Sequence, residues 1–206
     1  MARPVDFVAT PRSLAHALAR LEAADALSVP LLEDGARRRL MRAAARLPYR
    51  PACPVIGDGA RAVYQEFDLC ADLPLESPFH GLARALEDLL AQALARLDTP
   101  PLAVAPRLND LIVQRYPRGA LGITPHRDHI RYEGLVAIVP LCGAAHFFVC
   151  ADRSGRAPRP VPAPPGHLLL MRAPGFAGRR DRPFHAVRDI TVRRLTVGLR
   201  HDTRAA

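Results

Sequence analysis

The spacing of apolar residues changes about halfway along the chain. In the first half, leucines and alanines recur every three or four residues, as on the buried face of a helix. This spacing predicts three helices, each begun or ended near a proline, over Ser13 to Leu27, Glu33 to Leu47 and Phe79 to Leu97. Proline and glycine between the last two predict a loop over 48–60, which a strand over 62–69 follows.

From Asn109 onward, short apolar runs alternate with turns that contain glycine. These runs predict strands over Asp110–Tyr116, Leu135–Leu141, Ala145–Ala151, His167–Arg172, Phe184–Asp189 and Leu195–Arg200. Many short strands at this spacing are typical of a jelly roll or barrel. We therefore predict an α+β protein with a single domain over 1–206, in which a helical and lid portion (1–105) precedes a jelly-roll core (106–206).

Composition limits the class of protein. A length of 206 residues gives room for one domain with a substantial core. The sequence has no apolar run long enough to span a membrane and no signal peptide at its start, which predicts a cytoplasmic protein without a membrane partner. The four cysteines show no CxxC spacing, and we expect them to be buried small side chains: Cys53, Cys70, Cys142 and Cys150.

The net charge of +9 is unevenly distributed. The chain has no lysine, and residues 1–105 carry 12 arginines against 13 acids, whereas residues 106–206 carry 17 arginines against 7 acids. The basic excess therefore lies in the half that is predicted to form the jelly roll. Such a surface attracts small carboxylates and phosphates as well as nucleic acids, so charge alone does not identify the partner.

Two side chains of metal-ligand type, His126 and Asp128, are two residues apart and share one face of an extended segment. We take His185 as the third ligand, because it lies nine residues before Arg194 and one hairpin can bring both into the same cavity. Two histidines and a carboxylate leave iron(II) open positions for a bidentate acid and dioxygen, although these ligands also permit zinc or manganese. The competing histidines are His129, His146, His167 and His201.

Arg194 and Arg200 are six residues apart, with Thr196 and Gly198 between them on the same predicted strand face. A buried guanidinium requires an anionic partner to offset its desolvation, and its planar fork suits a carboxylate. A glycine on that face leaves room for a ligand. In the alternative arrangement, Arg193 and Arg194 straddle the strand and Arg200 lies at its exposed end.

In the order and spacing of these residues, 109–200 resembles the AlkB-like branch of the iron(II)- and 2-oxoglutarate-dependent dioxygenases. That family typically has Asn-x-Tyr, a glycine turn, His-x-Asp, a strand that ends in a Leu-Gly-like turn, a distal histidine, and two arginines six residues apart. The matching segments here are Gln114 to Tyr116, Gly119, His126 to Asp128, Leu141 to Gly143, His185, and Arg194 with Arg200.

The resemblance implies a double-stranded β-helix, a form of jelly roll, that hydroxylates or oxidatively demethylates a C–H bond. Fe(II), 2-oxoglutarate and O2 would be required, and succinate and CO2 would be formed. The residues implied to bind iron are His126, Asp128 and His185. Arg194 would pair with the distal carboxylate of 2-oxoglutarate, Arg200 would lie by its 2-oxo acid end, and Tyr116 and Gln114 would contribute hydrogen bonds.

Departures from the family pattern bear on the substrate. Gln114 replaces the usual asparagine, and Ile130 stands where nucleobase-demethylating members carry an acid. There is no tryptophan, so base stacking would fall to Tyr132, Phe176 or Phe184. These departures weaken the hypothesis of nucleic-acid repair. A small molecule, a protein side chain and an alkylated nucleic acid remain candidate substrates, and a non-catalytic jelly-roll binding module is a further alternative.

Three loops are candidates for substrate contact: 127–134, 173–183 and 48–77. The second contains Arg179, Arg180 and Arg182, which either bind a phosphate or carboxylate or form a solvated loop. The sequence does not predict the oligomeric state.

Overall fold

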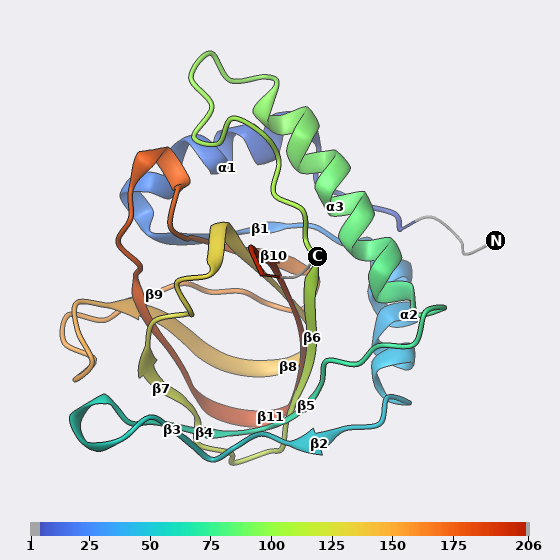
Figure 1. Ribbon diagram of the computed structural model, residues 1–206. Helices are drawn as coiled ribbons and strands as arrows, with labels where there is room; N and C mark the ends of the chain where they lie inside the picture. Colours follow the sequence, from blue (N-terminus) through green and yellow to red (C-terminus); the bar gives the residue numbers. More distant parts are fainter. Residues whose placement is uncertain (1–4, 205–206) are drawn as a thin grey trace.

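The computed structural model describes residues 5–204, and its three helices lie together on one side of the strands (Figure 1). The helices are α1 (Pro11–Ala24), α2 (Asp34–Ala44) and α3 (Pro78–Leu94). All three predicted helices are present, and each ends three residues before its predicted end. At the start of α1, the backbone N–H of Ser13 donates to the Thr10 side chain, 3.1 Å away, which caps the helix.

The strands of the first half are short, and those of the second half form most of the sheet. The first group is β1 (Ala26–Pro30), β2 (Arg50–Pro51), β3 (Val55–Ile56), β4 (Val63–Glu66) and β5 (Asp68–Cys70). The second group is β6 (Asp110–Tyr116), β7 (Gly122–His126), β8 (Tyr132–Cys150), β9 (Arg159–Pro160), β10 (His167–Arg172) and β11 (Phe184–Asp202). Two 3-10 turns lie at Gly59–Arg61 and Phe176–Gly178.

Strands β8 and β11 each contribute to two layers of the molecule. The first half of β8 pairs with β10 and the second half of β11 pairs with β6, in a large layer whose order is β1, β10, β8, β11, β6, β5, β2. The second half of β8 pairs with β9 and the first half of β11 pairs with β7, in a smaller layer that β4 extends. Two antiparallel layers joined by shared long strands form the predicted double-stranded β-helix, which confirms the α+β jelly roll.

A glycine permits the bend between the two halves of β8. Gly143 has a φ of 86°, and a Cβ at this position would lie 2.4 Å from the carbonyl oxygen of Arg193 on β11. Only glycine combines this backbone conformation with such a close approach. The two strands predicted on either side of Gly143 are therefore one bent strand.

Alternation of side chains along the large layer separates two apolar cores. On β10, Leu168 and Leu170 pack with the helices, whereas Leu169 and Met171 face the space between the layers. On β11, the side chains that pack with the helices are Leu195, Val197 and Leu199. The intervening positions of β11, which include both predicted arginines, therefore point into the jelly roll.

The sequence did not predict β1, because its apolar residues continue the leucine pattern of the first helix. The chain instead leaves α1 at Asp25, where φ is 64°, and Ala26–Pro30 pairs antiparallel with β10 at the edge of the large layer. Strand β7 was also not predicted as a strand, although its last residue is His126.

Within residues 5–204, the structure contains no helix with the length and apolarity needed to cross a membrane. The prediction of four buried cysteines is correct only in part. Cys70 is buried, Cys142 and Cys150 are partly buried, and Cys53 is exposed. All four have free thiols.

Candidate metal centre

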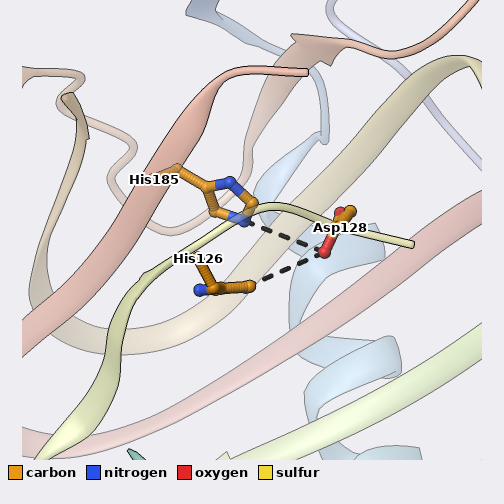
Figure 2. Close-up of side chains that lie close together, drawn as sticks. All are labelled: His126, Asp128 and His185. Carbon is orange, nitrogen blue, oxygen red and sulfur yellow. Dashed lines mark ion pairs between the residues drawn. The ribbon is translucent and has the colours of Figure 1, made fainter. Parts of the chain in front are cut away.

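Three ligand-type side chains meet between the layers, as predicted (Figure 2). His126 ends β7 and lies directly opposite His185 of β11 in the pairing of the two strands, and Asp128 follows two residues after β7. The Nε2 atoms of His126 and His185 are each 3.8 Å from Oδ1 of Asp128, and one ligand atom from each residue lies within 4.8 Å of the others. Metal–ligand bonds of about 2.0–2.2 Å allow one ion to reach all three.

The outer nitrogens of both histidines face backbone carbonyls. Nδ1 of His126 is 2.9 Å from the oxygen of Thr124, and Nδ1 of His185 is 3.4 Å from the oxygen of Pro183. A proton on Nδ1 would satisfy each carbonyl and leave Nε2 free to bind a metal.

The three candidate ligands have the charge states that metal binding requires. Burial lowers the pKa of His185 to about 3, with a further contribution from His126, and burial also lowers the pKa of His126. Burial alone would raise the pKa of Asp128, but Arg200 and the two histidines outweigh it and lower the pKa. Near neutral pH the site therefore holds two neutral imidazoles and one carboxylate.

The competing histidines lie elsewhere, and none joins this cluster in the part of the chain that the structure describes. His146 is exposed beside Asp189, 2.9 Å away. His129 accepts a hydrogen bond from a backbone N–H two residues later. His167 lies 3.4 Å from the hydroxyl of Ser28, and His201 lies 2.9 Å from a backbone carbonyl.

Arg194 is buried in the same cavity without a carboxylate partner among residues 5–204. Its Cζ lies 5.3 Å from the ring centroid of Tyr116, which is the cross-strand neighbour of Arg194 on β6. Burial lowers the pKa of Arg194 and raises the pKa of Tyr116 to about 12. The Tyr116 side chain, through its hydroxyl and its ring, is a neutral neighbour that does not offset the buried charge, so Arg194 could hold an external anion.

Arg200 has the opposite surroundings, although it lines the same cavity. Its Nη1 is 3.3 Å from Oδ2 of Asp110, and its Nε is 3.6 Å from Oδ2 of Asp128. Burial alone would lower the pKa of Arg200, but the carboxylates of Asp128 and Asp110 outweigh it and raise the pKa. Arg200 therefore connects the candidate metal ligand Asp128 to β6. The alternative with Arg200 at an exposed strand end is wrong.

Gly198, which was expected to leave room for a ligand, lies against the guanidinium of Arg200. A Cβ at this position would lie 3.2 Å from Nη1 of Arg200. The arginine side chain thus lies back along its own strand, across the glycine.

Gln114 also lines this cavity, and Thr196 is fully buried beside it. They are cross-strand neighbours, and the Thr196 hydroxyl donates to the Gln114 side-chain oxygen at 3.3 Å. The cavity here measures about 30 Å³, which holds one or two water molecules.

The sequence missed two contributors to the site. Phe147 stacks on His185 with 5.7 Å between ring centroids, and Asp110 pairs with Arg200. The available signal for Asp110 was its place at the start of a predicted strand, but its partner depends on which strands are neighbours. For Phe147 the sequence offered only an apolar position in a predicted strand.

Comparison with known proteins gives a match at the level of structure only. No family model and no curated protein matches the sequence. A prolyl hydroxylase from Trichoplax adhaerens, in complex with a hypoxia inducible factor peptide fragment, is similar with a TM-score of 0.67 and 12% identity, covering 93% of this chain and 90% of that chain. The fold is that of the 2OG-Fe(II) oxygenases.

Two further structures agree with this fold. A 2OG-Fe(II) oxygenase family oxidoreductase from Burkholderia pseudomallei has a TM-score of 0.62 and 15% identity, covering 100% of this chain and 98% of that chain. The non-heme alpha ketoglutarate dependent epimerase SnoN from nogalamycin biosynthesis has a TM-score of 0.61 and 20% identity, covering 91% and 84% of the two chains. These likenesses do not single out the AlkB-like branch.

Proposed function

We propose that the chain is a single-domain iron(II)- and 2-oxoglutarate-dependent dioxygenase that hydroxylates or oxidatively demethylates a C–H bond. The observation that carries this proposal is the arrangement inside the jelly roll. Two neutral histidines and a carboxylate lie within 4.8 Å of one another, beside a buried arginine that has no carboxylate partner among residues 5–204. This donor set is the facial triad typical of non-heme iron(II) oxygenases.

The residues present fit the cofactor and the cosubstrate. His126, Asp128 and His185 would hold iron(II), and Arg194 would bind the distal carboxylate of 2-oxoglutarate. When bound, iron, 2-oxoglutarate and dioxygen supply the oxidation of a C–H bond, with succinate and CO2 as the other products. Arg200 lies beside Oδ2 of Asp128, which orients Oδ1 toward the histidines.

The protein side chains also limit access of water to this chemistry. Phe147, Ile138 and Val187 line the cavity around the histidines, and Phe147 and Val187 are themselves buried. An apolar lining strengthens the interactions of charged groups within it and excludes bulk solvent.

The AlkB-type alternative, dealkylation of nucleic acid, has less support. Ile130, which replaces the acid of base-demethylating members, is 59% exposed. Phe176 is fully buried, and Tyr132 carries Arg131 and Arg200 within 5.1 Å of its ring centroid. Phe184 carries Arg127 at 4.1 Å. Each aromatic side chain expected to stack on a base is thus buried or already stacked by a guanidinium.

Two other hypotheses remain to be separated by experiment. The structurally similar prolyl hydroxylase is in complex with a peptide, so a protein side chain is one candidate substrate. A non-catalytic jelly-roll module would share the fold without the reaction.

Anaerobic calorimetry with iron(II) and then 2-oxoglutarate tests the proposal, together with an assay of succinate formation. We expect His126→Ala or Asp128→Ala to weaken iron binding by a factor on the order of 100 and to abolish succinate formation. His129→Ala removes a nearby histidine outside the triad and is the matched control. Turnover of 2-oxoglutarate without iron would contradict the proposal, and binding of neither would favour the non-catalytic module.

A further inference from the structure

A second cavity, of about 410 Å³, lies next to the candidate metal centre. Its wall includes Arg127, which is between the ligands His126 and Asp128 in sequence, and Phe184, which precedes the ligand His185. Nη1 of Arg182, another wall residue, donates to the backbone oxygen of Asp128 at 2.7 Å. The wall of this cavity therefore contains sequence neighbours of the candidate ligands, although it shares no residue with the cavity that holds them.

The cavity wall is rich in positive charge. Its arginines are Arg127, Arg159, Arg172, Arg179 and Arg182. Only two carboxylates, those of Asp25 and Asp181, line the same wall. The wall residues thus carry three more positive than negative charges, which favours an anionic occupant.

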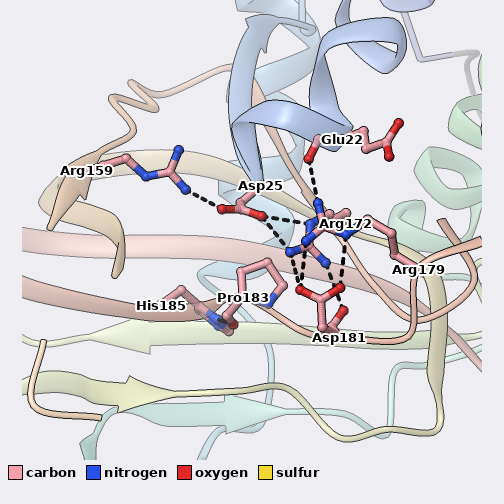
Figure 3. A network of polar contacts seen from close by, with 8 residues as sticks. All are labelled: Glu22, Asp25, Arg159, Arg172, Arg179, Asp181, Pro183 and His185. Atoms are coloured by element: carbon pink, nitrogen blue, oxygen red, sulfur yellow. Dashed lines mark hydrogen bonds and ion pairs between the residues drawn. The ribbon is translucent and has the colours of Figure 1, made fainter. Parts of the chain in front are cut away.

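The two carboxylates are already engaged by three of these arginines (Figure 3). Arg172 is 3% exposed and lies 2.6 Å from both Asp25 and Asp181. Arg159 pairs with Asp25, and Arg179 pairs with Asp181 at 2.9 Å. This network fixes the position of the loop that leads to His185, and it leaves no carboxylate of the wall for the other two arginines.

Arg127 and Arg182 pair with no carboxylate in the part of the chain that the structure describes. Arg127 instead lies over the ring of Phe184, with its Cζ 4.1 Å from the centroid. Arg153 lies over the same ring at 5.7 Å, and its buried Nη1 has no hydrogen-bond partner. We call Arg127 and Arg182 of the cavity wall, together with Arg153 beside Phe184, the rim arginines.

We propose that the rim arginines bind the anionic group of a small substrate, a carboxylate or a phosphate ester, beside the metal centre. This inference rests on the proposed function. Guanidinium groups bind both kinds of anion through paired hydrogen bonds. The cavity volume lies in the range of about 300–1,000 Å³ found for small-molecule sites. Because guanidinium groups already cover Phe184, the cavity offers no free aromatic platform to the bases of a nucleic acid.

Calorimetry on the full chain separates this inference from the proposed function. An anaerobic titration of 2-oxoglutarate in the presence of iron(II) comes first, and its outcome reports on the proposed function alone. Inorganic phosphate and, separately, butyrate are then titrated into the complex, in which 2-oxoglutarate occupies Arg194. If no complex forms, the same anions are titrated into the Arg194→Gln protein, which removes the interior arginine as an anion site.

We expect an anion to bind, and we expect Arg127→Gln to weaken its binding about ten-fold through loss of one charged contact. The double variant Arg127→Gln, Arg182→Gln should weaken it further. Arg188→Gln is the matched control, because Arg188 also lies over a phenylalanine ring, that of Phe148 at 4.9 Å, but does not line this cavity. Thermal melting of each variant establishes that it is folded, and Arg127→Gln alone leaves the contact of Arg182 with Asp128 intact.

Whichever anion binds more tightly, phosphate or butyrate, indicates whether the substrate carries a phosphate ester or a carboxylate. Butyramide, the neutral counterpart of butyrate, should not bind. Equal anion binding by the wild type, the Arg127→Gln protein and the Arg188→Gln protein would overturn the inference, as would the absence of binding. Stimulation of 2-oxoglutarate consumption by a single-stranded oligonucleotide, lost in Arg127→Gln, would replace the small substrate with a nucleic acid.

Discussion

The two arginines of β11 occupy one strand face and one cavity but have different electrostatic surroundings. Arg200 lies between two protein carboxylates, Asp110 and Asp128, and its pKa is raised. Arg194 faces the ring of Tyr116 and no carboxylate among residues 5–204, and burial lowers its pKa. An inward arginine is thus not by itself evidence for a ligand. The region that lacks a protein anion is where the carboxylate of 2-oxoglutarate is expected to bind.

The largest expected effect is at Arg194, the arginine that has no carboxylate partner among residues 5–204. Arg194→Gln should weaken 2-oxoglutarate binding to the iron-loaded protein by a factor on the order of 100, because it removes the buried partner of a carboxylate. Calorimetry under anaerobic conditions measures the affinity. Arg193→Gln is the matched control, because its side chain is on the exposed face one residue away. Equal affinities of the two variants for 2-oxoglutarate would show that the buried Arg194 is not its binding partner.

The grouping of the candidate site residues was predictable because it depends on short spacing and strand alternation. His126 and Asp128 share a face at a separation of two residues, and Arg194 and Arg200 share a face at a separation of six. His185 was chosen as the third ligand because it lies nine residues before Arg194, and the order of these residues then matched a dioxygenase family. The structure brings all five residues to one cavity.

The surroundings of these side chains were not predictable, because they depend on which strands are neighbours. The pairing of Arg200 with Asp110 follows from the contact of β11 with β6, which joins positions 90 residues apart. Strand β1 and the pairing of Asp25 with Arg172 follow from a backbone turn with a positive φ at Asp25, for which the helical leucine pattern gave no signal. Spacing along one strand identifies candidate residues, whereas charge compensation requires the whole topology.

The second prediction concerns His185, where burial lowers the pKa more than the carboxylate of Asp128 raises it. An unfolded histidine takes up a proton near pH 6.5, but in the folded protein the pKa of His185 is about 3. Protons therefore favour the unfolded state, and stability present above pH 6.5 is lost as the pH falls toward 3. Without metal, the free energy of unfolding should fall by about 2 kcal/mol between pH 6.5 and 5 from this residue alone.

Urea denaturation of the chelator-treated protein across this pH range measures the effect. His126, whose pKa burial also lowers, adds to the loss in the same direction. His185→Gln should reduce the slope of stability against pH by the contribution of one histidine. An unchanged slope in this variant would show that solvent reaches His185 and that burial does not dominate there.

The third prediction concerns Arg200, the arginine that lies beside the carboxylates of Asp110 and Asp128. Arg200→Gln removes the cation beside Asp128 and should weaken iron binding about ten-fold, a typical loss when a partner of a metal ligand is removed. Once iron is saturating, 2-oxoglutarate affinity should stay within about three-fold of the wild type, unlike in Arg194→Gln. Asp110→Asn, which removes the other partner of Arg200, should have a smaller effect on iron. A loss of 2-oxoglutarate affinity in Arg200→Gln as large as that in Arg194→Gln would show that both arginines bind the cosubstrate.

The smallest expected effect comes from Gly198→Ala, which adds one methyl group 3.2 Å from Nη1 of Arg200. The guanidinium must shift by a few tenths of an ångström, so its contact with Asp128 weakens and iron affinity should fall only about two- to three-fold. A double-mutant cycle with Arg200→Gln tests whether the loss of iron affinity arises from displacement of the Arg200 guanidinium. If the methyl group acts through the guanidinium, Gly198→Ala should have no further effect on iron affinity when residue 200 is glutamine. A loss that persists in the double variant would mean that Gly198 leaves room for the metal ligands or for a bound molecule, as the sequence first suggested.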